Sequence, residues 1–130
     1  MDSSYPKNQR LKSRKLMGRV FAEGASLSQY PIKLIYLKTE LPNDVKLQAG
    51  VAVPKKNFKS AVRRNRIKRL LREAYRLNNN ELFNNSGDRF ALLFLYLGKE
   101  MPSYPEIENA MKGVLARFSR QVPPIQKLIE

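Results

Sequence analysis

The chain is dominated by a basic amphipathic run at residues 54–77, PKKNFKSAVRRNRIKRLLREAYRL, in which Glu73 is the single acid. Good helix formers, uninterrupted by Gly or Pro, predict a helix from Ser60 to Leu77. The Ser60 hydroxyl can cap the first turn. The run Asn78-Asn79-Asn80 can end the helix, because Asn tolerates the left-handed backbone conformation.

This predicted helix has one apolar face and one cationic face. The apolar face, which we expect to be buried, consists of Ile67, Leu70, Leu71, Ala74 and Leu77. The cationic ridge consists of Arg64, Lys68, Arg72 and Arg76. A solvated helix usually pairs opposite charges at i+4 spacing, because like charges repel there. A polyanion is therefore the simplest partner for the ridge, and a merely solvated face is the alternative interpretation.

Composition narrows the classes of function. The 130 residues suffice for one domain with a modest core, and the net charge of +14 indicates nucleic acid or an anionic membrane surface as partner. The chain has no Cys and no His, which excludes the usual zinc sites and His-based acid–base catalysis. No apolar stretch reaches membrane-spanning length and no secretory signal is present, so we expect a soluble cytoplasmic protein.

The remaining pattern predicts an α+β domain of two layers, with helices packed on a small sheet. The expected elements are a helix at 13–23, strands at 25–30, 31–38, 46–53 and 89–97, and a core helix at 106–120. We expect strand 46–53 to be the hairpin partner of strand 31–38. The apolar strand 89–97 suits a position covered on both faces, as beside a parallel neighbour. The expected divisions are a flexible N-terminus at 1–9, a single domain at 10–120 and a tail at 121–130.

Two of these elements have distinct faces. The buried stripe of the last helix should be Ile107, Ala110, Met111, Val114, Leu115 and Phe118. Strand 46–53 has one small, polar face, on which Gly50 leaves room for a backbone or a ligand to approach.

The acids of this chain do not form a nuclease site. The eleven carboxylates are scattered, whereas a two-metal nuclease needs clustered acids to hold its ions. The sequence also lacks a glycine-rich phosphate loop. The residues alone therefore indicate a binding protein rather than a catalyst.

The order of residues in the basic run resembles a known family. The string Arg64 to Glu73, RNRIKRLLRE, is similar to the central helix of the bacterial ribonuclease P protein subunit. The preceding GVAVPKK at 50–56 resembles the strand that leads into that helix. Arg10-Leu11-Lys12, Val20-Phe21 and Gly24 also have family-like spacing, so the resemblance covers residues 8–118.

This resemblance implies an αβββαβα-type fold with a left-handed βαβ crossover through the basic helix. It also implies a function: the protein binds the catalytic ribonuclease P RNA and the 5′ leader of precursor tRNA, and assists removal of that leader. The RNA subunit would perform the hydrolysis with Mg²⁺. We therefore expect no catalytic residue, metal site or cofactor in this chain, and no membrane partner.

The resemblance also assigns residues to two sites. The expected contacts to the catalytic RNA are Lys55, Lys56, Arg63, Arg64, Asn65, Arg66, Lys68, Arg69 and Arg72. The expected leader cleft is formed by Met17, Phe21, Tyr36 and Gly50, where bases can stack on aromatic rings. Strand register leaves open whether Tyr36 or Ile35 faces this cleft. The segment 57–61, NFKSA, lacks the Gly that many members have, so its turn should differ in detail.

Two further functions fit the same charge. A ribosomal or tRNA-binding protein without a processing role shares both the charge and the fold class. A DNA-binding protein could place the basic helix in a major groove, but Asn65 is the only obvious base-reading side chain of that helix.

Overall fold

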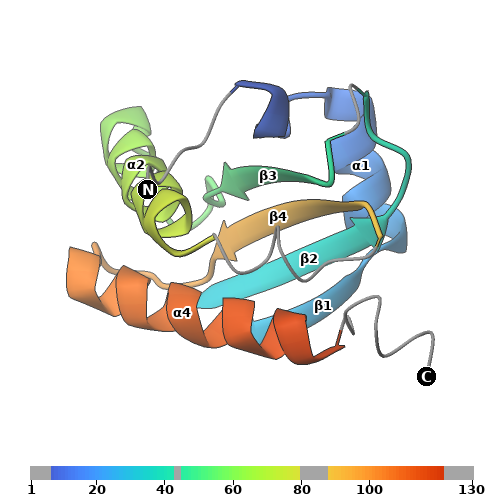
Figure 1. Ribbon diagram of the computed structural model, residues 1–130. Coiled ribbons are helices and arrows are strands. Elements are labelled where there is room, and N and C mark those ends of the chain that lie inside the picture. The colour runs from blue at the N-terminus through green and yellow to red at the C-terminus, as the bar shows by residue number, and fades with distance from the viewer. Residues whose placement is uncertain (1–6, 43–44, 80–87, 122–130) are drawn as a thin grey trace.

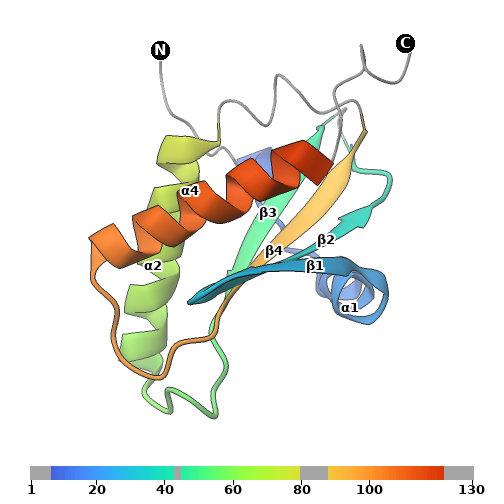
Figure 2. The same cartoon turned by 90° about the horizontal axis from the view of Figure 1, so that it is seen from below.

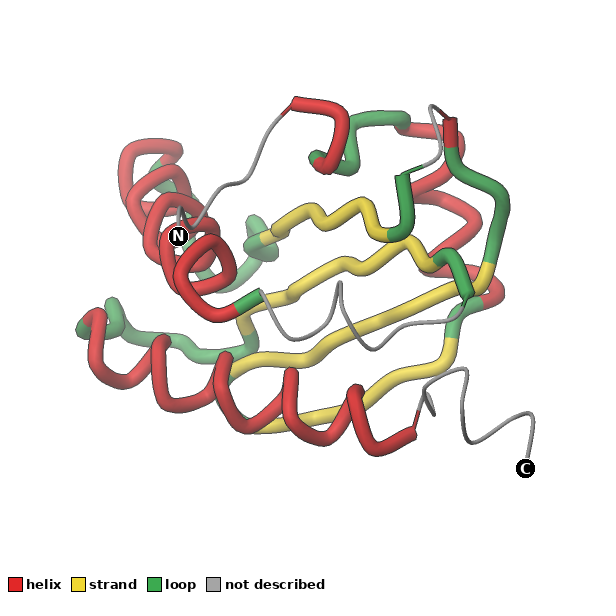
Figure 3. The backbone as a smooth tube through the Cα atoms, viewed as in Figure 1, coloured by secondary structure: helices red, strands yellow, loops and turns green. Residues whose placement is uncertain are grey.

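The computed structural model describes residues 7–42, 45–79 and 88–121, which form a four-stranded sheet with helices on both faces (Figures 1 and 3). The elements in chain order are η1 (Lys7–Gln9), α1 (Arg14–Glu23), β1 (Ala25–Gln29), β2 (Ile32–Lys38), β3 (Leu47–Ala52), α2 (Ala61–Asn78), β4 (Phe90–Tyr96) and α4 (Tyr104–Gln121). The predicted α+β class and αβββαβα order are confirmed, with η1 as an added short 3-10 helix.

The strand order of the sheet is β1-β2-β4-β3. β2 pairs antiparallel with β1 and with β4, while β3 pairs in parallel with β4. The predicted hairpin between strands 31–38 and 46–53 is therefore wrong, because β4 lies between them. The sequence of β4, FALLFLY, is apolar on both faces, so β4 is best placed inside the sheet with both faces covered. The expected parallel neighbour of this strand is β3.

Two cores of unequal size lie on the two faces of the sheet. α2 and α4 cover one face and α1 covers the other, as the view from below shows (Figure 2). Alternate residues of β4 point to opposite sides, with Phe90, Leu92 and Phe94 in the larger core and Ala91 and Leu93 in the smaller one.

The βαβ unit consists of β3, α2 and β4. The left-handed sense expected for it depends on the path of residues 80–87, which lie outside the described residues.

The helix α4 confirms the predicted stripe in full. All six stripe residues are buried. The helix begins at Tyr104, two residues before the predicted start, because Ser103 and Glu106 cap it reciprocally. The Glu106 N–H donates to Ser103 Oγ at 3.3 Å, and the Ser103 N–H donates to Glu106 Oε1 at 3.1 Å. Pro105 is tolerated in the first turn, where its missing N–H is not needed.

The helix α2 confirms the predicted cap and corrects the stripe. The Arg63 N–H donates to Ser60 Oγ at 3.3 Å. Ile67, Leu71 and Ala74 are buried and Leu70 is half-buried, but Leu77 is 41% exposed. The buried arc instead includes Tyr75, 1% exposed, whose ring lies 5.3 Å from that of Phe94.

The end of α2 differs from the expectation as well. Its C-cap residue Asn79 has φ −92° and ψ −4°, which is right-handed rather than left-handed backbone. Asn79 is also buried, and Asn80, the last residue of the predicted run, lies outside the described residues.

The helix α1 is capped by Ser13, whose Oγ accepts from the Leu16 N–H at 3.1 Å. It ends at Gly24, where the chain passes close to β2. A Cβ at Gly24 would lie 2.5 Å from the Val20 carbonyl oxygen and 2.8 Å from that of Tyr36. Gly is needed there because the backbone approaches β2 too closely for any side chain.

Candidate nucleic-acid interface

The cationic surface is built from α2 and from residues 54–60, which we call the lysine loop because they include Lys55, Lys56 and Lys59. The inner face of α2 is committed to the larger core, so its remaining side chains must point outward. The exposed residues on this surface are Lys55, Lys56, Lys59, Arg63, Asn65, Arg66, Arg69 and Arg72. Arg64 and Lys68 are half-buried. The structure thus brings the predicted RNA-binding residues together on one helix and the loop before it.

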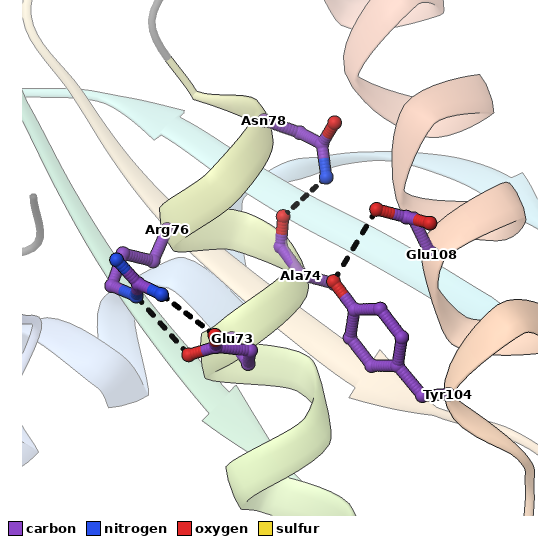
Figure 4. Close-up of polar contacts among 6 residues, drawn as sticks. All are labelled: Glu73, Ala74, Arg76, Asn78, Tyr104 and Glu108. Carbon is purple, nitrogen blue, oxygen red and sulfur yellow. Dashed lines mark hydrogen bonds and ion pairs between the residues drawn. The ribbon is translucent and has the colours of Figure 1, made fainter. Parts of the chain in front are cut away.

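Charge on this surface is poorly compensated. In the described part of α2, Glu73 and Arg76 form an ion pair, with Arg76 Nη2 at 2.6 Å from Glu73 Oε2. The hydrogen bond from Arg76 lowers the pKa of the Glu73 carboxyl. Figure 4 shows this pair on the outer side of α2, near its C-terminal end. Because Arg76 is engaged with Glu73, the uncompensated charge is concentrated in the N-terminal part of the helix.

Two hydrogen bonds near the C-terminal end of α2 each stay within a single helix. There the Asn78 side-chain amide donates to the Ala74 carbonyl at 2.7 Å, and the Tyr104 hydroxyl of α4 donates to Glu108 at 3.4 Å (Figure 4). Burial, with the nearby Glu108 carboxylate, raises the pKa of Tyr104. Near this end of α2, the cation Arg76 is paired with Glu73.

Arg64 does not behave as a free member of the cationic ridge. Its Nη1 donates to the carbonyl oxygen of Phe58 at 2.7 Å and to that of Lys59 at 2.9 Å. The sequence did not predict these main-chain partners of Arg64. Its guanidinium is turned back onto the lysine loop.

The lysine loop folds without the glycine expected from its relatives. The N–H groups of Asn57 and Phe58 both donate to the Pro54 carbonyl, at 3.2 and 3.3 Å. Phe58 is buried, with its ring 6.0 Å from that of Tyr96. Burial raises the pKa of Tyr96 to about 12, and its hydroxyl donates to the Glu100 carbonyl at 2.7 Å. The buried side chain of Phe58 thus anchors a turn that contains no glycine.

The residues expected to form a leader cleft are divided between the two faces of the sheet. Met17 packs against the smaller core, and Phe21, on the same helix α1, is 54% exposed. Gly50 is on this side too, but the N-terminal segment covers it. A Cβ at Gly50 would lie 3.2 Å from both the Cβ and the carbonyl oxygen of Leu11. The space that Gly50 leaves is therefore filled by the chain itself.

Tyr36 lies on the opposite face from α1. Its ring centroid is 5.1 Å from that of Phe118 in α4, and its hydroxyl donates to Gln121 Oε1 at 2.9 Å. Ile35, its neighbour in β2, belongs to the smaller core beneath α1. Of the two alternatives left open by the sequence, Ile35 is the one on the side of Phe21.

Sequence reasoning missed the part that Leu11 plays in this region. Its N–H donates to the Ala49 carbonyl at 2.8 Å, which ties the N-terminal segment along β3. Gln48 supports the same segment, because its Nε2 donates to the Asn8 carbonyl at 3.1 Å. The sequence feature that could have indicated this contact is the face of strand 46–53 that has small side chains. Such a face can admit a neighbouring backbone as readily as a ligand.

The described residues contain neither a metal-ligating cluster nor a membrane-spanning helix. Among residues 7–42, 45–79 and 88–121, no group of three or more acidic side chains could hold a metal ion. Within the same residues, no helix combines the length and hydrophobicity needed to cross a membrane.

Comparison with known sequences finds a match over most of the chain. The family model described as Ribonuclease P matches residues 5–119. A ribonuclease P protein component of Porphyromonas gingivalis is 35% identical over 120 residues, covering 90% of this chain and 88% of that protein. One from Chlorobium phaeobacteroides is 38% identical over 128 residues, covering 87% of this chain and 86% of that protein.

Comparison with solved structures finds the same fold. The RNase P protein of Staphylococcus aureus superposes with a TM-score of 0.65 at 20% identity, covering 86% of this chain and 96% of that one. The RNase P protein of Thermotoga maritima gives a TM-score of 0.60 at 23% identity, covering 87% and 96%. By the family match and these relatives together, the chain belongs to the ribonuclease P protein family, the protein components of the enzyme that processes the 5′ ends of tRNA.

Proposed function

We propose that the surface of α2 and the lysine loop binds ribonuclease P RNA, while the outer side of α1 holds the 5′ leader of precursor tRNA. The observation that carries the first part is the uncompensated charge on α2. The opposite face of that helix is already buried in the core, so the cations have no structural reason to gather there. Each Lys or Arg that neutralises a phosphate releases counterions, which favours binding to RNA.

The chemistry is proposed to belong to the RNA subunit. The chain contains neither His nor Cys and its acids are scattered, so general acid–base groups are scarce. The Mg²⁺ ions that assist hydrolysis would be held by the RNA, and the protein would act in the cytoplasm with that RNA as its partner. Its contribution would be affinity and orientation rather than bond cleavage.

Phe21 supports the proposal for the leader. A large aromatic side chain that is 54% exposed on a basic helix offers a platform on which an unpaired base can stack. Arg14 and Lys15 are exposed on the same helix and could accompany the backbone of a single strand. Met17, half-buried beside them, would add apolar contact, whereas Tyr36 is too far removed on the other face to take part.

The test compares precursor tRNA with mature tRNA. A complex with ribonuclease P RNA should bind the precursor more tightly, and Phe21→Ala should reduce that preference by about 1–3 kcal/mol, the value of one stacked base. Tyr30→Ala is the matched control, because Tyr30 is 73% exposed but lies between β1 and β2, away from α1. Equal affinities for the two tRNAs in the wild-type complex would contradict the leader assignment. Site-specific cleavage by RNA-free protein would contradict the placement of the chemistry in the RNA.

A further inference from the structure

The lysine loop carries its cations on exposed side chains, but its main chain is held from within. On the inner side, Phe58 is buried against Tyr96. On the outer side, Lys55, Lys56 and Lys59 are all exposed. Phe58 therefore fixes the loop to the core from one side, while the three lysines of the loop face outward. The direction in which these lysines point depends on the main-chain conformation next to Phe58.

Arg64 holds the main chain of the loop in place where the loop joins α2. Its Nη1 donates to two successive carbonyl oxygens, those of Phe58 and Lys59, at 2.7 and 2.9 Å. These carbonyls lie immediately before Ser60, which caps the helix through the Arg63 N–H. One guanidinium therefore joins the first turn of α2 to the last residues of the loop.

Charge-assisted hydrogen bonds of this kind are stronger than neutral ones and, with a planar guanidinium, fix geometry as well. A loop held in its bound conformation does not lose that freedom when RNA binds, so its contacts cost less entropy. Without Arg64, Phe58 would still be buried, but the two carbonyls would have to find water, and the lysines would sample many directions.

We propose that Arg64 is a positioning residue, which holds the lysine loop so that Lys55, Lys56 and Lys59 meet RNA phosphates together, an inference that rests on the proposed function of this surface. Arg64 then acts on RNA affinity mainly through the loop and not through a phosphate contact of its own. Arg69 differs, because it is an exposed cation of α2 whose side chain makes no hydrogen bond or ion pair within the described residues.

A double-mutant cycle with ribonuclease P RNA tests this inference. The proteins are wild type, Arg64→Gln, a triple variant with Lys55→Gln, Lys56→Gln and Lys59→Gln, and the combination of all four changes. Arg69→Gln, alone and in the triple background, is the matched control. Affinity is measured over a range of salt concentrations, at a temperature where circular dichroism shows each variant to be folded.

If Arg64 positions the loop, Arg64→Gln removes one charge but weakens the phosphate contacts of several lysines. The slope of log K against log salt should then flatten by more than about 0.9, the most that one phosphate contact provides. In the triple background, Arg64→Gln should weaken binding by less than about twofold, because independent effects add and a shared one does not. Arg69→Gln should weaken binding equally in both backgrounds.

The other outcomes each overturn a different statement. A slope change for Arg64→Gln of about 0.9 or less, with equal loss of affinity in both backgrounds, would make Arg64 a direct contact and overturn its positioning role. No effect of Arg64→Gln in either background would overturn it as well. If neither the lysine triple nor Arg69→Gln changed affinity, the proposed RNA-binding surface itself would be wrong.

Discussion

The helices α2 and α4 make a matched pair with different outer surfaces. Each has 18 residues, and both pack on the same face of the sheet and against each other (Figures 1 and 2). The exposed side of α4 mixes Glu106 with Lys112 and Arg120, whereas Glu73 is the single acid of α2. Burial explains the inner sides of both helices. Folding does not explain why the charges on the outer side of α2 are almost entirely cationic, so we infer that this side binds an external partner.

The largest expected effect should be common to the two helices. Leu71→Ala in α2 and Met111→Ala in α4 each remove a fully buried side chain and should lower the free energy of unfolding by about 2–5 kcal/mol. Leu70→Ala should cost less, because Leu70 is only half-buried. Denaturant unfolding measures all three. Val62→Ala is the control, since Val62 is 79% exposed, and a cost for Leu71→Ala as small as that of Val62→Ala would contradict the described core.

The second expected effect separates two arginines of α2. Arg64→Gln removes a charged donor from two main-chain carbonyls and should lower the free energy of unfolding by about 1.5–3 kcal/mol. Arg69→Gln, an exposed change, should stay within about 0.5 kcal/mol of wild type. Thermal unfolding without RNA checks the pair. Equal stabilities for the two variants would mean that the contacts of Arg64 with the loop contribute nothing.

A smaller effect tests whether Tyr36 belongs with α4. Tyr36→Phe keeps the ring against Phe118 and removes the hydrogen bond to Gln121, which should cost about 0.5–1.5 kcal/mol of stability. The preference for precursor over mature tRNA should be unchanged. Phe21→Ala should show the reverse pattern, with little loss of stability and a reduced preference. A loss of preference in Tyr36→Phe would place Tyr36 in the leader site after all.

The same comparison shows what sequence could predict. The stripe of α4 was predicted residue by residue, because every apolar residue at helical spacing there is also buried. In α2 the pattern was ambiguous, since Leu77 and Tyr75 border the stripe on opposite sides. The structure buries Tyr75, which packs against Phe94 on β4. Which side of an apolar arc is buried depends on the neighbouring element, and spacing within one helix does not contain that information.

Pairing of strands and the direction of single side chains were harder still. Adjacent strands in sequence usually pair, but β4 enters between β2 and β3 because its two apolar faces both need cover. The main-chain partners of Arg64 were missed for a related reason. Its carbonyl partners belong to an irregular loop, whose main-chain geometry no periodicity predicts. By contrast, the clustering of Arg66, Arg69 and Arg72 on an exposed surface follows from helical spacing alone.

The central claim is that the charge of α2, and not charge in general, binds ribonuclease P RNA. Two double variants with the same change in net charge test it, Arg69→Gln with Arg72→Gln in α2 and Lys112→Gln with Arg120→Gln in α4, all four being exposed residues. The measurement is the slope of log K against log salt for binding of the RNA. We predict that the α2 pair flattens the slope by about 1.4–1.8 and that the α4 pair leaves it nearly unchanged. Equal flattening by the two pairs would contradict the claim and show that RNA responds only to the net charge of the protein.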